Sequence, residues 1–217
     1  MNAGDERSLL VIKVSLAAIF GALAILFTRV FVPLPFGNPN LGSTPVTLAA
    51  VFCPLSVGML TGIIKGIGAS IWTGQAFIEM PAGIGDAMMA AFIYSLKRSR
   101  IVKQSKLPDN VKLAICATLG QLSRYIFTSG MIALYIGLAA SYGFDEAAKE
   151  KFLQIAAKYS GLMGMTLHPV LLNIVVVWLA IFVAVTISII VNAIISCAII
   201  VSAGRSIKRM LSQFGIE

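Results

Sequence analysis

The stretch SLAAIFGALA, Ser15–Ala24, lies inside the first long apolar segment of the chain, which covers about residues 9–32. A helix of that length and composition can cross the hydrocarbon core of a bilayer. The segment is too long for the core of a signal peptide and lacks a clear cleavage site, so we expect it to remain as a transmembrane helix. Its middle consists of Ala and Gly, which leaves one helix face with few side chains.

The composition extends this prediction to the whole chain. Of its 217 residues 58% are hydrophobic and only 12% are charged, and the mean hydropathy is +0.92. A soluble domain usually has about a quarter of its residues charged and less than half apolar. No segment between the apolar runs is long enough to bury the core of a separate soluble domain. We therefore predict an all-α integral membrane protein with a single transmembrane domain over residues 1–217.

The net charge of +8 comes from basic residues that flank the apolar runs. This distribution is the positive-inside bias of membrane proteins, so it places the clusters and both termini in the cytoplasm and makes nucleic acid a poor explanation for the charge. The three clusters are Arg7 and Lys13; Lys97, Arg98, Arg100, Lys103, Lys106 and Lys112; and Arg205, Lys208 and Arg209.

Six transmembrane helices follow from the charge clusters and the apolar runs. The first two clusters are both cytoplasmic only if an even number of crossings separates them, and four runs are available, near residues 9–32, 45–60, 62–79 and 81–97. Lys65 lies close to the junction of the second and third runs, where its side chain would extend to the cytoplasmic surface. Glycines from Gly58 to Gly85 predict close packing of these helices.

The second half of the chain supplies the two remaining spans. A fifth span covers about residues 111–138, and one net crossing is expected within residues 161–203, with the part before Pro169 folded over the outer face. The segment between them is too polar to cross, and its apolar residues recur at helical spacing, so we predict an amphipathic helix on the outer surface at 144–159. These apolar residues are Phe144, Ala148, Phe152, Ile155 and Tyr159.

The sequence contains no enzyme motif and only one histidine. We expect no catalytic site, no bound metal and no cofactor in this chain. The informative residues are instead polar groups at membrane depth, because each is costly there unless it has a partner or a wet cavity. Those near the outer half predict a binding cavity open to the exterior, and we select Trp72, Gln75, Glu79, Asp86, Arg124, Tyr125, His168 and Asn173 as candidate contacts of a ligand.

Structural roles remain open for each of these candidates. Asp86 and Arg124 lie at similar depths, and they form either a buried ion pair or contacts with a ligand. Trp72 and His168 also suit the membrane interface, Glu79 suits a loop before Pro81, and an asparagine such as Asn173 can simply bond a neighbouring helix. The uncharged loop Val32–Val46 is either a lid over the cavity or a plain connector, and the 144–159 helix is a second candidate lid.

Two segments, LGSTPVTLAAVFCPLSVGMLTGIIKGIGA (Leu41–Ala69) and MPAGIGDAMMAAFIYSLKR (Met80–Arg98), resemble the substrate-binding S components of energy-coupling factor (ECF) vitamin transporters. In that family a helix that begins with proline leads to an apolar Gly/Pro turn and a Gly-rich helix, and the next span ends in a basic cytoplasmic loop. The similarity covers most of the chain and concerns the order of its segments and their residue composition. It departs after Pro169, where the apolar stretch is longer than one helix needs.

This resemblance implies a function in the plasma membrane. The chain would capture a vitamin-like or related small water-soluble compound outside the cell. A transmembrane coupling protein (the T component) and two ATPase subunits would drive uptake, so ATP would be used by the partners and not by this chain. A self-sufficient secondary transporter is the main alternative, and a membrane enzyme or assembly subunit is another.

The resemblance also assigns a role to the opening helix. S components carry an Ala-x-x-x-Ala pattern in their first helix, where the coupling protein docks, and Ala18 and Ala22 match it, with Ala17 and Gly21 alongside. Residues one turn apart stack into a flat strip on which another helix can pack. The alternative for this strip is close packing within the same chain.

Overall fold

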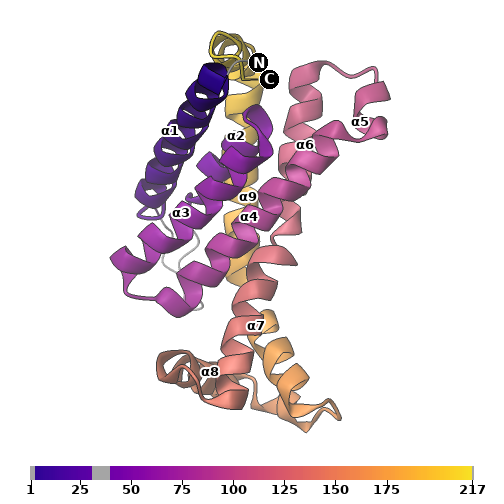
Figure 1. The fold of residues 1–217 in the computed structure, drawn as a ribbon. Coiled ribbons are helices and arrows are strands. Elements are labelled where there is room, and N and C mark those ends of the chain that lie inside the picture. Colours follow the sequence, from indigo (N-terminus) through magenta and orange to yellow (C-terminus); the bar gives the residue numbers. More distant parts are fainter. Residues whose placement is uncertain (1–2, 31–39, 217) are drawn as a thin grey trace.

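The computed structural model describes residues 3–30 and 40–216, and the regular elements in this part of the chain are helices (Figure 1). In chain order these are α1 (Ala3–Phe27), α2 (Ser43–Phe52), α3 (Leu55–Thr73), α4 (Ala76–Arg98), α5 (Arg100–Gln104), α6 (Asp109–Ser123), α7 (Phe127–Tyr142), α8 (Glu146–Lys158), the 3₁₀ helix η1 (Ser160–Gly164) and α9 (Pro169–Ser212).

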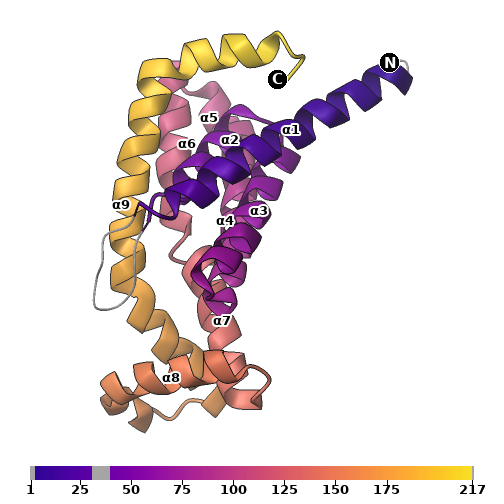
Figure 2. The same cartoon turned by 90° about the vertical axis from the view of Figure 1, so that its left-hand side faces the viewer.

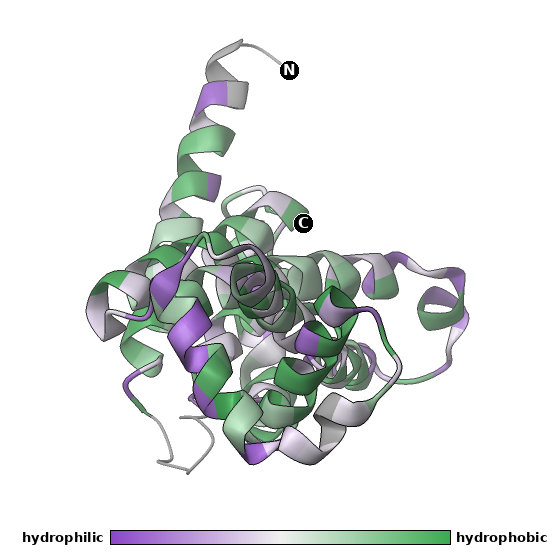
Figure 3. Ribbon diagram, turned by 90° about the horizontal axis from the view of Figure 1, so that it is seen from below, coloured by the Kyte–Doolittle hydropathy of each residue, from purple (hydrophilic) through white to green (hydrophobic). Residues whose placement is uncertain are grey.

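Five segments of the described chain are long and apolar enough to cross a membrane: Arg7–Phe27, Leu55–Thr73, Ala76–Arg98, Asp109–Tyr142 and Ala184–Ser212. Hydrophobic residues also dominate the bundle when it is viewed from the α8 end (Figure 3). The chain is therefore an all-α protein with the features of a multi-pass membrane protein.

The second predicted span, near residues 45–60, is wrong in length. Helix α2 has only 10 residues, about 15 Å at 1.5 Å per residue, which is half the thickness of the hydrocarbon core. The chain breaks at Cys53 and Pro54, because a proline disfavours helical backbone in the residue before it, and α3 begins directly afterwards. The boundary expected near residue 61 therefore lies about seven residues earlier.

The turn between α3 and α4 is also displaced from the predicted one. Gly74 ends α3 with a φ of 68°, a left-handed conformation that glycine adopts without strain. Helix α4 then begins at Ala76, so Glu79 lies in its first turn and Pro81 lies inside the helix. The expectation that Glu79 belongs to a loop before Pro81 is corrected accordingly.

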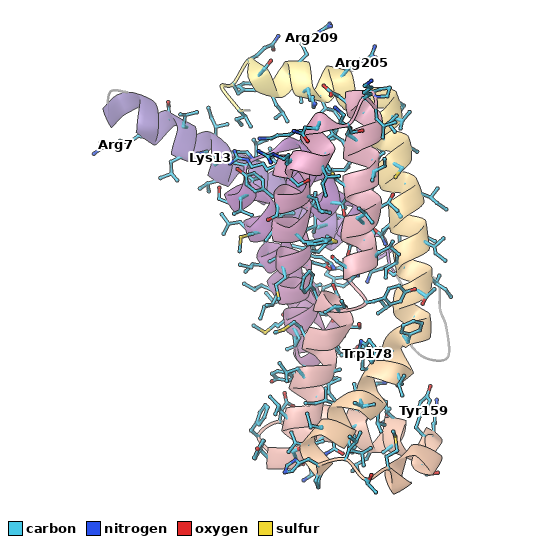
Figure 4. All side chains as sticks on the ribbon, turned by 90° about the vertical axis from the view of Figure 1, so that its right-hand side faces the viewer. Arg7, Lys13, Tyr159, Trp178, Arg205 and Arg209 are labelled. Atoms are coloured by element: carbon cyan, nitrogen blue, oxygen red, sulfur yellow. The ribbon has the colours of Figure 1, made fainter. Side chains whose placement is uncertain are left out.

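The described ends of the chain lie at the same end of the molecule. Figure 4 shows Arg7 and Lys13 of α1 at the same upper end of the molecule as Arg205 and Arg209 of α9, and α5 lies at this end too (Figure 1). Helix α8 lies across the opposite end, and the last part of the 44-residue α9 bends over the basic end (Figure 2). The three basic clusters are therefore separated from α8 by the length of the bundle.

The interior has two apolar clusters separated by a polar layer. The cluster towards the basic end includes Val46, Val57, Met89, Ile93 and Ile200, and the cluster towards α8 includes Ile132, Ile136, Phe152, Val176 and Val177. The order along α4 and α9 places the polar layer between them, with Asp86 before Met89, and Ser188 and Asn192 between Val177 and Ile200.

Lys97 closes the C-terminal end of α2 from the neighbouring helix α4. Its ammonium group donates to the carbonyl oxygens of Ala50, Val51 and Cys53 at 3.0, 3.0 and 3.1 Å. The last carbonyls of a helix have no partner inside the helix, and a cation there also interacts favourably with the helix dipole.

The Lys97→Met variant is expected to lose about 1–2 kcal/mol of stability, because the side chain keeps its length while the three carbonyls lose a charged donor. The midpoint of thermal unfolding in detergent measures the loss. Lys103→Met, at an exposed position in α5, is the matched control and should leave the midpoint within the error. Equal midpoints for both variants would contradict the capping role of Lys97.

Candidate functional site

Asp86 is the centre of the polar layer. Its side chain is fully buried, and its two carboxylate oxygens accept hydrogen bonds from both flanking sides of the bundle. Ser43 donates to Oδ2 at 2.9 Å from the start of α2, and Thr128 donates to Oδ1 at 2.9 Å from α7. A buried carboxylate with several donors remains ionised without water, so the charge of Asp86 is fixed at this depth.

Two buried cations pair with this carboxylate. Arg124 Nε lies 3.1 Å from Asp86 Oδ1, and the ammonium group of Lys65 contacts Asp86 Oδ2. All three residues are at most 5% exposed. The predicted proximity of Asp86 and Arg124 is confirmed, but Lys65 does not extend to a membrane surface as expected. The cluster of Lys65, Asp86 and Arg124 carries one net positive charge.

The break between α6 and α7 brings Arg124 to the cluster. Arg124 follows the end of α6 at Ser123, and its Nη1 group donates to Ser188 Oγ of α9 at 3.0 Å. Trp178 of α9 donates from Nε1 to the carbonyl oxygen of Tyr125 at 2.8 Å. These contacts tie the break to α9 and hold the guanidinium in place.

Further hydrogen bonds connect the cluster to α2 and α9. Thr44 donates to Asn192 Oδ1 at 2.7 Å, and Asn192 Nδ2 donates to the carbonyl oxygen of Asn40 at 2.8 Å. Gln121 Nε2 donates to Thr47 Oγ1 at 2.6 Å. A polar layer whose members satisfy one another in this way is rigid, because a group that left it would be buried without a partner.

A cavity of about 1230 Å³ extends from this layer towards α8. Lys65, Arg124, Thr128 and Ser188 form its inner end, and residues of α8 close its other end. Between them the helices α4, α7 and α9 supply a mostly apolar wall. A volume of this size accommodates a small organic molecule.

The rim of the cavity carries Arg29, Trp72, Gln75 and Glu79. The guanidinium of Arg29 stacks over the indole ring of Trp72, with Cζ 3.1 Å from the ring centroid. Trp72 is 58% exposed and Gln75 is also exposed, so both remain accessible. Stacking uses the face of the guanidinium and leaves its N–H groups, which point outward from its edge, available to bind an acceptor.

Helix α8 presents one face to the cavity, and this face contains the basic side chains Lys151 and Lys158. The acidic residues Glu146 and Glu150 of α8 do not line the cavity. Asp145 caps the helix by accepting from the Ala148 backbone N–H at 3.0 Å, and it also accepts from the Tyr135 hydroxyl of α7 at 2.8 Å. The predicted amphipathic helix is therefore present and is fixed to the bundle at its first turn.

Four of the eight candidate contacts line the cavity, and four do not. Trp72, Gln75, Glu79 and Arg124 belong to its wall, and Asp86 lies directly behind Arg124. The remaining three candidates lie outside the cavity wall. Tyr125 stacks on Phe182 and donates to Thr186 Oγ1. Exposed His168 caps α9 by accepting from the Val170 N–H, and Asn173 donates to Ser141 Oγ.

The candidate lids have different outcomes. Helix α8 closes one end of the cavity. Most of the Val32–Val46 loop, residues 32–39, lies outside the described residues. From Ser43 onwards the predicted loop belongs to helix α2. Asn40, which belongs to this loop and precedes α2, lines the cavity.

The small-residue strip of α1 divides into two faces. Ala18 and Ala22 are exposed, together with Val14, on the outside of the bundle. Ala17 and Gly21 are buried, and a Cβ atom at Gly21 would lie 2.5 Å from Ile64 Cγ2 of α3. Ala17 and Gly21 therefore pack inside the chain, and of the four residues predicted to dock a partner Ala18 and Ala22 are the exposed ones.

Several lining residues were not among the predicted contacts. These include Lys65 and Ser188 at the inner end, Arg29 just after α1, and Lys151 and Lys158 of α8. The depth of Lys65 follows from the observed bounds of α3 and α4, because the residue lies about as far before their turn as Asp86 lies after it, and the predicted bounds did not give this depth. Within the described residues, no three His, Cys, Asp or Glu side chains are grouped to hold a metal ion.

Comparison of the chain with protein-family models, characterised proteins and solved structures found no match.

Proposed function

We propose that this chain is the substrate-binding subunit of an ECF-type importer in the plasma membrane, and that it captures a small water-soluble, vitamin-like compound from outside the cell. The transmembrane coupling protein and two ATPase subunits of the complex drive uptake, and the chain itself is not an enzyme. The main support for this proposal is the 1230 Å³ cavity, which lies towards the end of the bundle away from the three basic clusters.

The position of the basic clusters supports this orientation. Lys and Arg residues near span ends favour the cytoplasmic side, so the end with α5 and both described chain ends faces the cytoplasm. Six traverses, one of them containing the short α2, bring both termini to that side. The cavity and α8 then lie towards the exterior, where a binding subunit needs them.

The exposed residues Ala18 and Ala22 support docking of the coupling protein on α1. A helix packs most closely where its neighbour carries small side chains, since association within lipid depends on close van der Waals contact. Helix α1 buries only 17% of its most apolar window within the chain, so most of its surface is available to lipid or to a partner.

Substitution of both Ala18 and Ala22 by tryptophan is expected to reduce recovery of the ATPase subunits at least about tenfold when the tagged chain is purified from its native membranes. The bulky side chains separate the two helices and remove their contact. Ala198→Trp, at an exposed alanine of α9, is the matched control and should retain the ATPases. Recovery of the ATPases by the double variant would contradict docking on this strip.

A transport measurement separates the proposed function from the main alternative. The chain alone in liposomes should show no solute uptake under an ion gradient, whereas the complex with its ATPases should import solute when ATP is supplied. Ion-driven uptake by the chain alone would identify a secondary transporter and would contradict the proposed function.

A further inference from the structure

The cavity has three zones that succeed one another along the helices. Its inner end is the buried layer with Lys65 and Arg124. Apolar side chains follow for about two turns outward, from Val185 and Ile181 on α9 and from Ile132 and Ile136 on α7. Eight residues separate Thr128 from Ile136, which corresponds to about 12 Å along α7. Arg29 lies to one side, where its neighbour Thr28 is close to Lys65 and its guanidinium reaches Trp72, and the basic residues of α8 line the far end.

The charges that line the cavity are strongly unequal. The described lining residues include the cations Arg29, Lys65, Arg124, Lys151 and Lys158 but only one carboxylate, that of Glu79. Asp86, behind the wall, balances one further cation. The net charge of these lining residues together with Asp86 is therefore about +3. The segment 31–39, which lies outside the described residues, carries no ionisable side chain and cannot alter this balance.

Among the cations that line the cavity, Arg29 is the one best prepared to bind an anion. Within the described part of the chain, neither Arg29 nor Lys151 forms an ion pair. The stacked indole ring of Trp72 restricts the guanidinium to one plane, so less freedom is lost when its N–H groups bind a carboxylate or phosphate. Among the described residues, the guanidinium has a partner for its face but no ion-paired acid at its edge.

We propose that the cavity binds a water-soluble organic acid, with the carboxylate or phosphate at Arg29, in the positive field to which Lys151 contributes, and the apolar body against Ile132, Ile136 and Val185. The inference rests on the proposed function of the chain as a binding subunit, and it adds the chemical class of the compound. An anion in this position offsets the excess positive charge of the cavity lining, and the apolar zone buries the rest of the molecule. A cation would face a net positive lining.

Matched probes test the charge of the ligand on the delipidated chain in detergent. Indole-3-acetate, its amide and tryptamine share one ring system but are anionic, neutral and cationic, and benzoate, benzamide and benzylamine form a second set. Phenyl phosphate adds the other anionic group. Acids are expected to raise the thermal unfolding midpoint, to lose this effect as salt rises, and to exceed their amides and amines.

Two variant pairs locate the anion. Arg29→Gln is expected to weaken acid binding about tenfold or more, because it removes a charged donor, and Lys151→Gln is expected to weaken binding less, because it removes a more distant positive charge. Arg98→Gln is the control for Arg29, since Arg98 also stacks on an aromatic ring, that of Tyr94, but does not line the cavity. Lys149→Gln is the control for Lys151 on the same helix, outside the cavity. Both control variants should bind as the unchanged chain does.

An anionic phospholipid carries similar chemistry, so phosphatidylglycerol in detergent micelles forms a separate arm. Stabilisation by this lipid without any effect of the dissolved acids would overturn the proposal. So would equal stabilisation by amides or amines, a panel in which no acid binds, or equal losses in the control variants. Binding of cations would leave the proposed transport function intact, whereas loss of ATPase recovery would contradict that function without affecting the acid site.

Discussion

Replacement of Asp86 by asparagine is expected to destabilise the protein by about 3–5 kcal/mol. The side chain keeps its shape, but Lys65 and Arg124 then remain buried without a counter-charge, and the removal of one partner from a buried ion pair typically costs this much. For a chain of this size the loss corresponds to a fall of roughly 10 °C or more in the midpoint of thermal unfolding.

A control and a rescue variant distinguish this effect from a general one. Asp109→Asn removes an exposed carboxylate, 3.9 Å from Lys112, and should cost less than about 1 kcal/mol. Lys65→Met combined with Asp86→Asn leaves one buried cation in place of two and should recover part of the loss. A midpoint for Asp86→Asn equal to that of the unchanged chain would mean that Asp86 carries no charge in the folded protein.

Replacement of Gly83 by leucine is expected to cost about 3 kcal/mol, at the upper end of the usual range for overpacking. A Cβ atom at Gly83 would lie 2.5 Å from the Cα atom of Gly66 and 2.8 Å from the carbonyl oxygen of Gly62, both in α3. These are backbone atoms that cannot rotate away, so α3 and α4 must separate. Separation of the two helices also pulls Lys65 away from Asp86.

The same measurement, the thermal unfolding midpoint in detergent, applies to Gly83→Leu. Gly130→Leu in α7 is the matched control, because nothing lies within 4 Å of a Cβ atom at that position. That variant should be neutral or slightly stabilising, since glycine is a poor helix former. If both variants behaved alike, the close approach of α3 and α4 would not contribute to stability.

The features that follow from local chemistry were predictable from the sequence. Apolar runs identified the helices, and Phe152 and Ala148 at helical spacing identified the amphipathic α8. The glycines between Gly58 and Gly85 predicted the close packing that Gly62, Gly66 and Gly83 now form. Asp86 and Arg124 carry opposite charges at similar predicted depths in the membrane, and this predicted their contact.

The features that depend on how helices rotate and end were not predictable. A basic residue near an expected turn suits the membrane surface, but α3 begins earlier than expected, and this shift moves Lys65 inward by about two turns. Ala17 and Ala18 are adjacent in sequence, yet Ala17 is buried and Ala18 is exposed, which the packing of neighbouring helices against α1 decides. Tyr125 and Asn173 face helices α9 and α7 for the same reason.

The short helix α2 follows different rules of substitution from its neighbours. Nine of its ten residues are buried within the protein, so it has almost no boundary with lipid. Its side chains are selected by the volume and hydrogen bonds of protein neighbours, as in the interior of a water-soluble enzyme, and that is why Thr44 and Thr47 are acceptable there. A change of lipid or detergent should therefore act on α1 and spare α2.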